Sequence, residues 1–396
     1  MKYLVIIGDG MADFPLDELG GKTPLMAARK PNIDHVAKEG FCGQVVTVPP
    51  GFSPGSDIAC MSLFGYDPAK YYTGRAPLEA YGMGLAMNGR DVAFRCNLVY
   101  LDVRLPKVLM GDYSAGHITT EEAKVLVEDL GAAIGGDNFR FFPGVGYRHL
   151  MIWKDGLADM VTIPPHDILD KEVVDHMPSG DGSRSIITLM SDSQIFLKDH
   201  RVNRDRRERG LAPANSIWLW GQGRRPSFPP FSEKYGVKEG AVVAAVDLIK
   251  GIGALAGFST PPVAGATGYL DTDYGAKARK ALELLGRDDI VYLHVEAPDE
   301  ASHEGSVKEK IRAIERIDEE VVGYLLDRVG EDVRVLVATD HATPISMRTH
   351  YACPVPFAVF QKGRRLGPGG AYDEKNAGRV HSGEEMVALF LRGWES

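Results

Sequence analysis

Two short and almost entirely apolar segments constrain the fold most, because acidic and imidazole side chains follow each of them. The first covers residues 290–295 and the second covers residues 333–338. Runs of this length and composition predict buried strands of an α/β sheet. Since open α/β sheets bind ligands beyond the carboxyl ends of their strands, the sequence predicts a polar site there. The side chains that follow the two segments are Asp299, His303, Asp340 and His341.

These side chains have the chemistry of metal ligands. Asp299 and His303 are four residues apart, so on a helical turn they point the same way, and their oxygen and nitrogen atoms suit a divalent ion such as Mn or Zn. Asp340 and His341 are adjacent and would diverge from a strand end, so they could serve two neighbouring ions. Two ions about 3.5 to 4 Å apart can clamp a phosphoryl group. A single Asp/His pair often only caps a turn, but five such residues, counting His350, favour a metal site.

The beginning of the chain repeats this arrangement. Residues 3–7 predict a buried strand, and Asp9 follows it between two glycines. A dinucleotide-binding loop requires a third glycine, and Asp13 stands in its place. We therefore interpret Asp9 as a further metal ligand.

A possible nucleophile follows a loop rich in proline and glycine. Ser56 or Asp57 would be a good N-cap for the helix expected after this loop. The free N–H groups of a helix N-terminus favour an anion, so Ser56 is placed to become a phosphoserine. The alternative is that Ser56 only caps the helix, as most N-cap serines do.

The middle of the chain differs from both ends. Residues 91–101 alternate like a half-buried antiparallel strand, and residues 119–130 predict an amphipathic helix with a Thr-x-x-Glu start. Strands alternate with helices on both sides of this region. We expect one doubly wound α/β sheet formed by residues 1–88 and 226–396, interrupted by an inserted α+β cap domain of residues 89–225.

This middle region contains many basic residues without an obvious acidic partner. We interpret it as a domain that binds an anion, although arginine clusters are often only solvated surface, above all in residues 204–209. The basic residues are Arg95, His117, Arg148, His149, Arg184, Arg204, Arg206 and Arg207.

Composition limits the partners of the chain. Its 396 residues are 44% hydrophobic and 25% charged, as in a globular protein. The net charge of -9 argues against nucleic acid or an anionic membrane, but a local arginine cluster could still bind a small anion. The four cysteines form no CxxC pair, the first apolar run is too short for a signal peptide, and no segment has the roughly 20 apolar residues of a membrane span. We expect a cytoplasmic protein, and an oligomer is compatible with the sequence.

Together, these motifs resemble the alkaline phosphatase superfamily and, within it, the cofactor-independent phosphoglycerate mutases of the archaeal type. The resemblance covers nearly the whole chain, and the ordered set of motifs is specific. It rests on Gly8-Asp9-Gly10, Ser56, Asp299-x-x-x-His303, Asp340-His341 and His350-x-x-x-Pro354, and on the segments at residues 20–25, 54–57, 62–68 and 147–149.

The resemblance implies an alkaline-phosphatase-like sheet that binds two divalent ions, which could be Mn, Zn or Mg. Ser56 would take the phosphoryl group of a phosphoglycerate and return it to the other hydroxyl, with no need for bisphosphoglycerate or a nucleotide. The implied ligands of one ion are Asp299, His303 and His350, and those of the other are Asp9, Ser56, Asp340 and His341.

The resemblance also implies a cap that excludes water and binds the substrate, a small phosphorylated metabolite. Asp112 would be the base and acid for the glycerate hydroxyls. Trp220 departs from the archaeal pattern, which has an arginine there. A related bacterial branch has been suggested to act as a homoserine kinase, so a phosphotransferase acting on another metabolite is the alternative, although no P-loop or kinase glycine-rich loop is present. The implied anion ligands are Arg95, Arg148, Arg184, Arg206 and Lys234.

Overall fold

A computed structural model describes residues 1–104, 106–375 and 378–393, which form two compact units. The first unit contains residues 1–72, 81–83 and 227–396, and the second contains residues 73–80 and 84–226. The second unit thus begins before residue 89, because it includes Arg75 and Glu79 of helix α5 (Arg75–Gly82), which pair with each other and with Arg95.

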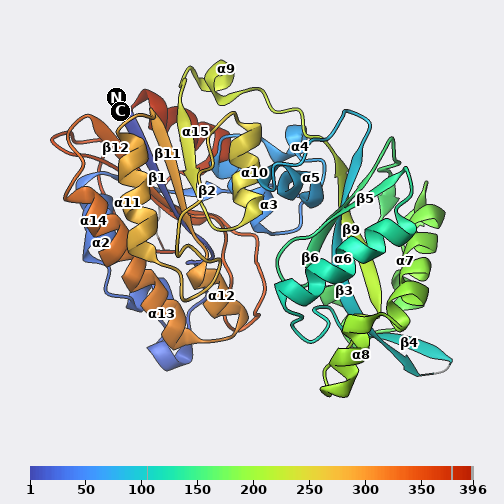
Figure 1. The fold of residues 1–396 in the computed structure, drawn as a ribbon. Coiled ribbons are helices and arrows are strands. Elements are labelled where there is room, and N and C mark those ends of the chain that lie inside the picture. Colours follow the sequence, from blue (N-terminus) through green and yellow to red (C-terminus); the bar gives the residue numbers. More distant parts are fainter. Residues whose placement is uncertain (105, 376–377, 394–396) are drawn as a thin grey trace. The chain divides into compact units, whose positions relative to one another are not determined.

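The first unit is built on a seven-stranded sheet (Figure 1). Four neighbouring strands are parallel, and β13 runs antiparallel to both of its neighbours, so the sheet is mixed. The strands in spatial order are β10 (Gly240–Val243), β11 (Ile290–Val295), β1 (Lys2–Gly8), β12 (Val333–Thr339), β13 (Val355–Gln361), β2 (Phe41–Val46) and β14 (Val380–Ser382).

Helices cover both faces of this sheet. Leu4 and Ile6 of β1 point into the core beneath one set of helices, and the alternation of a strand turns Val5 and Ile7 to the other face. The first face is covered by α2 (Pro31–Glu39), α11 (Tyr274–Leu285) and α13 (Val307–Arg316), and the second by α3 (Ser56–Leu63), α10 (Asp247–Leu255) and α15 (Gly383–Arg392). The sheet is therefore buried on both sides, as the apolar strand sequences predicted.

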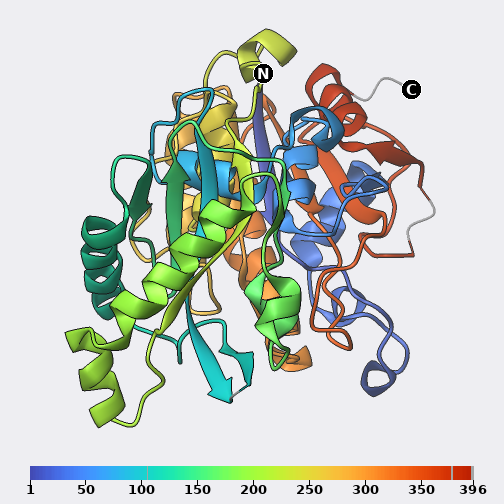
Figure 2. The same cartoon turned by 90° about the vertical axis from the view of Figure 1, so that its right-hand side faces the viewer.

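The second unit has its own antiparallel sheet and its own hydrophobic core. Helix α7 packs on β9 and helix α6 packs on β5, and the two helices also contact each other (Figure 2). The strands are β3 (Val92–Arg104), β4 (Lys107–Asp112), β5 (Phe139–Phe142), β6 (Arg148–Trp153) and β9 (Ser216–Arg224), and the helices are α6 (Thr120–Ile134), α7 (Ser183–Lys198) and α8 (Arg201–Glu208).

The predicted start of α6 is confirmed in atomic detail. The Thr119 side chain accepts a hydrogen bond from the Glu122 backbone N–H and caps the helix. The helix then buries Ala123, Leu126, Val127 and Leu130, which recur at helical spacing. A polar cap followed by an apolar stripe is thus enough to define this helix from sequence.

The remaining described elements are short. They connect the larger elements or, in the case of α12, end close to the site described below. They are η1 (Asp17–Leu19), α1 (Pro24–Ala27), α4 (Pro68–Tyr71), β7 (Met160–Val161), η2 (Pro165–Ile168), η3 (Val173–His176), β8 (Ser179–Gly180), α9 (Phe231–Tyr235), α12 (Ala297–His303), η4 (Ile317–Gly323) and α14 (Tyr324–Leu326).

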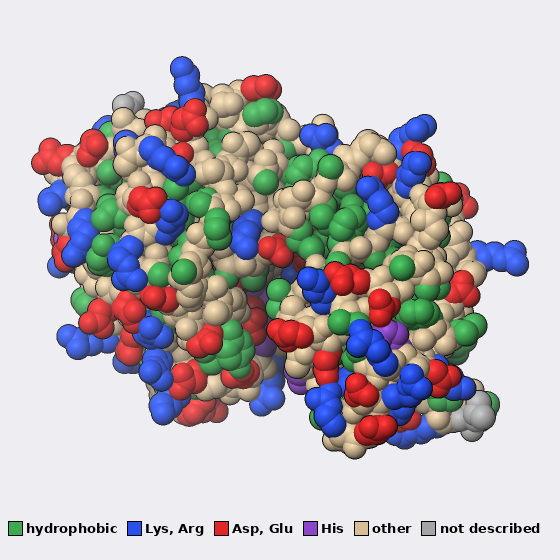
Figure 3. Space-filling view, viewed as in Figure 1, with side chains coloured by type: hydrophobic (Ala, Val, Ile, Leu, Met, Phe, Trp, Pro, Cys, Tyr) green, Lys and Arg blue, Asp and Glu red, His purple; other side chains and the backbone are tan. Residues whose placement is uncertain are grey.

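On the face shown in Figure 3, Lys and Arg side chains are interspersed with Asp and Glu side chains. Among the described residues, the helices are too short or too polar to cross a membrane.

Candidate active site

Ser56 is the first residue of α3 and does not cap it. Gly55 is the N-cap, so the expectation that Ser56 or Asp57 would cap the helix is wrong. The Ser56 hydroxyl instead lies 3.2 Å from Nε2 of His341. The serine therefore combines two features of a nucleophile, a helix N-terminus and an imidazole neighbour.

Asp9 and Asp340 lie together because β1 and β12 are parallel neighbours with Gly8 opposite Thr339. The N–H groups of Gly10 and His341 both donate to Oδ1 of Asp340, at 3.0 and 2.8 Å. Nε2 of His341 lies 3.2 Å from Oδ2 of Asp340 and 3.5 Å from Oδ1 of Asp9. The three side chains are buried and form one group that could hold a metal ion.

Asp299, His303 and His350 form the adjoining half of the site. Asp299 and His303 share α12, which confirms the helical turn predicted from their spacing. Nε2 of His303 lies 3.1 Å from Oδ2 of Asp299, and Nε2 of His350 lies 3.6 Å from Oδ1. The two Nε2 atoms are 3.1 Å apart, so the histidines and the carboxylate converge on one point.

The backbone at Gly10 permits this convergence. Gly10 has φ 62°, and a Cβ at this position would lie 2.7 Å from both Oδ1 of Asp299 and Oγ1 of Thr343. Only glycine combines the left-handed conformation with so close an approach. This geometry explains why the second glycine of the Gly8-Asp9-Gly10 motif is required.

The electrostatics of the site fit divalent cations. Burial raises the pKa of Asp9 well above its usual value, and the nearby Asp340 and Asp299 carboxylates raise it further. Burial lowers the pKa of His341 to about 4. Oδ1 of Asp9 is buried and makes no hydrogen bond. Crowded carboxylates, a neutral imidazole and an unsatisfied oxygen are a donor set that a divalent cation would complete.

Lys234 and Asp112 are both engaged in local contacts. The Lys234 ammonium pairs with Glu384 and lies over the rings of Tyr66, Tyr71 and Tyr235. The Asp112 carboxylate accepts hydrogen bonds from the Ser114 N–H, the Ser114 hydroxyl and the Gly116 N–H. Asp112 therefore orders its own loop in the second unit, and its role as a base stays a prediction.

Arg95 belongs to a basic cluster in the second unit that sequence reasoning identified only in part. Nε of Arg95 lies 3.0 Å from Glu79, which also pairs with Arg75 at 2.9 Å. The Arg95 guanidinium stacks on Trp220, 4.4 Å from the ring centre. Burial lowers the pKa of Arg95 to about 10, and the charges of Arg75 and Arg148 act in the same direction. Two guanidinium groups thus pair with the Glu79 carboxylate, and the charge of Arg148 also acts on it, so positive charge gathers in this part of the second unit.

Arg206 and Arg184 do not join this cluster. Arg206 is fully buried and donates to Glu122, to the Ala115 carbonyl and to the Ala212 carbonyl. It holds the packing of α8 in the second unit, so the expectation that it binds substrate has no support in its position. Arg184 is exposed in the first turn of α7.

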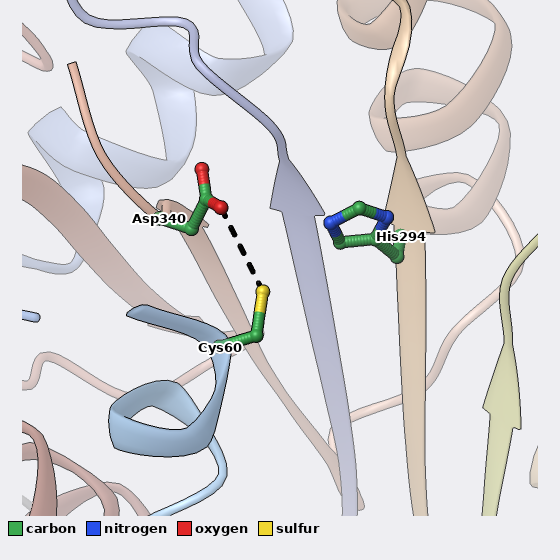
Figure 4. Close-up of side chains that lie close together, drawn as sticks. All are labelled: Cys60, His294 and Asp340. Carbon is green, nitrogen blue, oxygen red and sulfur yellow. Dashed lines mark hydrogen bonds between the residues drawn. The ribbon is translucent and has the colours of Figure 1, made fainter. Parts of the chain in front are cut away.

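Sequence reasoning missed three buried residues beside the candidate ligands. The Thr343 hydroxyl donates to Oδ1 of Asp299 at 2.6 Å and lies 3.1 Å from Nδ1 of His341, so it links the two halves. Cys60 and His294 lie next to Asp340, with Sγ of Cys60 3.7 Å from Oδ2 of Asp340 (Figure 4). The one available signal was His294 itself, an imidazole inside an otherwise apolar strand.

Fold and site together define a class: an α/β protein with a serine hydroxyl at a helix N-terminus, beside side chains that could hold metal ions. The comparisons with known proteins make the class specific. A family profile described as 2,3-bisphosphoglycerate-independent phosphoglycerate mutase matches residues 37–203. The mutase of that name from Methanothrix thermoacetophila is 50% identical over 99% of this chain and 100% of its own length. A protein from Geobacter sulfurreducens named as a probable mutase of this kind is 50% identical, over 95% of each chain.

Two solved structures resemble this chain over nearly its whole length. The PH0037 protein from Pyrococcus horikoshii is 32% identical with a TM-score of 0.83, and the match covers 100% of this chain and 98% of that one. The cofactor-independent phosphoglycerate mutase from Thermoplasma acidophilum is 27% identical with a TM-score of 0.65 over 99% of both chains. This chain belongs to the family of 2,3-bisphosphoglycerate-independent phosphoglycerate mutases.

Proposed function

We propose that this protein interconverts 3-phosphoglycerate and 2-phosphoglycerate through a phosphoserine at Ser56, without 2,3-bisphosphoglycerate or a nucleotide. The observation that most supports the proposal is the Ser56 hydroxyl, 3.2 Å from His341 and next to buried carboxylates and imidazoles. Relatives that are 50% identical over nearly the whole chain have the name of this activity. Family and local chemistry therefore point to the same reaction.

The proposed metal ligands divide into two groups. Asp299, His303 and His350 would hold one divalent cation, and Asp9, Ser56, Asp340 and His341 would hold the other. Cations bound there would lower the pKa of the serine hydroxyl and balance the charge of the phosphoryl oxygens. Manganese, zinc and magnesium are all compatible with ligands of this kind.

In the proposed reaction the phosphoryl group moves twice. Ser56 gives up its hydroxyl proton as Oγ attacks phosphorus and takes a proton back when the phosphoserine is cleaved. In the first step the bond from phosphorus to the glycerate oxygen breaks, and that oxygen takes up a proton. In the second step the other glycerate hydroxyl attacks the phosphoserine, loses its proton and releases Ser56. Asp112 is our proposed carrier of these protons, and its three hydrogen bonds with its own loop would have to loosen for it to act.

We propose that the second unit is a cap inserted into an alkaline-phosphatase-like sheet and that it binds the substrate. The positive charge gathered around Glu79 supports Arg95 and Arg148 as ligands of the substrate anions, with Arg75 as an addition. Such a mutase must exclude water, because water would hydrolyse the phosphoserine. The proposed role of the cap is therefore both binding and protection.

Phosphorus NMR tests the function. The purified protein is incubated with manganese and 3-phosphoglycerate, with neither ATP nor bisphosphoglycerate present. The proposal predicts that 2-phosphoglycerate appears and that a chelator stops its formation. Release of inorganic phosphate alone, or an unchanged spectrum, would contradict it.

A phosphotransferase that acts on another metabolite remains the alternative because of Trp220. The indole stacks on Arg95 and its N–H donates to Asn97 at 3.0 Å, so a bulky ring occupies the position where the resemblance to archaeal mutases led us to expect an arginine. Homoserine with ATP is the substrate pair to test. Formation of phosphohomoserine at a higher kcat/KM than the isomerisation would favour this alternative.

A further inference from the structure

A continuous chain of buried polar groups connects helix α11 to the proposed metal ligand Asp9. Nζ of Lys277 in α11 lies 2.7 Å from Oε2 of Glu296 and 3.1 Å from the His294 carbonyl. Nδ1 of His294 lies 3.2 Å from Oε1 of Glu296, and Nε2 lies 3.4 Å from Oδ2 of Asp9. The order is therefore Lys277, Glu296, His294, Asp9.

The sheet explains why these groups meet. Strands β1 and β11 are parallel neighbours with Ile7 opposite His294. Asp9 and Glu296 come directly after the last residues of the two strands. The imidazole therefore lies beside both carboxylates, with one ring nitrogen toward each of them.

This chain of polar groups is deeply buried, and a contribution to stability is not a sufficient reason for it. The side chains of Lys277, Glu296, His294 and Asp9 are 0%, 6%, 1% and 6% exposed. Buried ion pairs of this kind are often no better for stability than apolar residues of similar volume. Burying these charged groups costs desolvation energy, and a purely structural role does not explain why the polar chain ends at the candidate site.

The hydrogen bonding also points toward the site. The contacts of His294 with the two carboxylates have the distances of ion pairs but not the angles of hydrogen bonds, and Oδ1 of Asp9 makes no hydrogen bond. By contrast, the buried Lys310 is fully satisfied by Asp13, the Ala12 carbonyl and the Thr343 carbonyl. Unsatisfied buried side-chain atoms are rare in proteins, and four of those found among the described residues belong to Asp9, His294 and Glu296.

We propose that His294, held in place by Glu296 and Lys277, is a positioning residue for Asp9 and sets the affinity of the cation that Asp9 and Asp340 hold. The inference rests on the proposed metal site of the mutase. Groups behind a metal ligand fix its orientation, and their loss typically weakens metal binding about 10- to 100-fold. The chain acts on Asp9 and leaves the ligands on α12 untouched, so the effect is selective for one cation of the two.

Calorimetric titration of the metal-stripped, full-length protein with manganese tests this. The variants are Glu296→Gln and Lys277→Met, and a double variant, Lys277→Met with Glu296→Leu, removes the buried pair at similar volume. The control is Asp318→Asn, which alters another buried carboxylate of the first unit, one that binds Asn32 and the Ile33 N–H. Circular dichroism and thermal melting confirm that each variant folds.

We expect the wild-type protein and Asp318→Asn to bind two manganese ions with the same affinities. In Glu296→Gln, Lys277→Met and the double variant, one ion keeps its affinity and the other binds about 10- to 100-fold more weakly. In a His303→Ala background, in which the α12 group is disrupted, Glu296→Gln weakens the ion that remains. The double variant melts near the wild-type temperature and still shows the weaker binding, which separates positioning from a structural role.

Two results would overturn the inference while leaving the mutase proposal intact. One is wild-type affinity for both ions in the folded chain variants. The other is a third manganese ion in the wild-type protein that is lost in Cys60→Ser, because Cys60, His294 and Asp340 would then be a metal site themselves (Figure 4). Two bound ions without isomerisation of 3-phosphoglycerate would contradict the proposed function instead.

Discussion

The Ser56 hydroxyl lies 3.2 Å from Nε2 of His341, and His341 in turn lies 3.2 Å from the carboxylate of Asp340. Ser56 opens α3, whereas Asp340 and His341 follow β12, so the contact joins segments far apart in the sequence. The mutase proposal depends on this junction because it places a hydroxyl among groups that can hold a cation.

Replacing either of two buried aspartates, Asp9 and Asp13, with asparagine should change the stability of the protein, and the two changes should have opposite signs. Burial and the nearby Asp340 and Asp299 carboxylates raise the pKa of Asp9, whereas Asp13 pairs with Lys310 at 2.7 Å. In metal-free protein, Asp9→Asn should raise the free energy of unfolding by about 1 kcal/mol, because a carboxylate with a raised pKa destabilises the fold at neutral pH. Asp13→Asn should lower it by about 3 kcal/mol, because Lys310 loses its partner. Urea unfolding with a chelator present measures both changes.

Manganese should reverse the order of stability of Asp9→Asn and the wild-type protein. At a manganese concentration 100 times the dissociation constant, a bound ion stabilises the wild-type protein by about 2.7 kcal/mol. Asp9→Asn should gain less, since it lacks a ligand of one ion. An equal gain in both proteins would show that Asp9 is not a ligand.

Arg148 and Arg206 are two arginines of the second unit whose replacement should have different effects. Arg148 is exposed, whereas the guanidinium of Arg206 is buried against Glu122 and two carbonyls. Arg148→Met should raise KM for 3-phosphoglycerate at least about 10-fold, because a hydrogen bond to a charged group contributes about 1.5–3 kcal/mol, and should leave the melting temperature nearly unchanged. Arg206→Met should destabilise the protein by about 2 kcal/mol with little effect on KM. Steady-state kinetics measures KM, and thermal melting measures stability. A large loss of stability in Arg148→Met, or a large rise of KM in Arg206→Met, would contradict this assignment.

His149 should make the second unit sensitive to acid. Burial, with a contribution from the charge of Arg148, lowers the pKa of His149 to about 3, and Nδ1 accepts a hydrogen bond from the Gly144 N–H at 3.0 Å. The unfolded chain, with an ordinary histidine pKa of about 6.5, binds more protons than the folded protein between these two values. Stability is therefore full above about pH 6.5 and falls by up to about 1.4 kcal/mol per pH unit as the pH drops toward 3.

Replacement of His149 tests this dependence. His149→Gln should lose less stability than the wild-type protein between pH 7 and pH 5, and His166→Gln, a change at an exposed histidine of the same unit, should follow the wild-type protein. Unfolding is followed by tryptophan fluorescence, which reports mainly on the second unit through Trp153, Trp218 and Trp220. Parallel curves for all three proteins would assign the acid sensitivity to other groups.

The sequence predicted those parts of the structure that depend on local pattern. Apolar runs identified β1, β11 and β12, and the four-residue spacing identified α12, since these signals depend only on strand burial and helix geometry. The start of α3 was wrong by one or two residues, because Gly55 takes the N-cap position expected for Ser56 or Asp57. A capping preference does not determine which of several neighbouring residues takes that position.

The rest depends on contacts between distant segments, which local patterns do not contain. Arg148 and Arg206 look alike in sequence, and only the packing of α8 shows that Arg206 is buried against Glu122. His294 was visible as a histidine in an apolar strand, but its two carboxylate neighbours follow from the pairing of β1 with β11. Strand order was therefore the missing information for this part of the site.

The most direct test of the central claim compares Ser56→Ala with Ser62→Ala. Both serines belong to α3, but the Ser62 hydroxyl donates to the Thr47 carbonyl at 2.6 Å, away from the candidate ligands. The phosphorus NMR spectrum of 3-phosphoglycerate is followed with manganese for the wild-type protein and both variants. The account predicts conversion to 2-phosphoglycerate by the wild-type protein and Ser62→Ala, and a rate at least about 1000-fold lower for folded Ser56→Ala, because no acceptor for the phosphoryl group remains. Isomerisation by Ser56→Ala within about tenfold of the wild-type rate would contradict it.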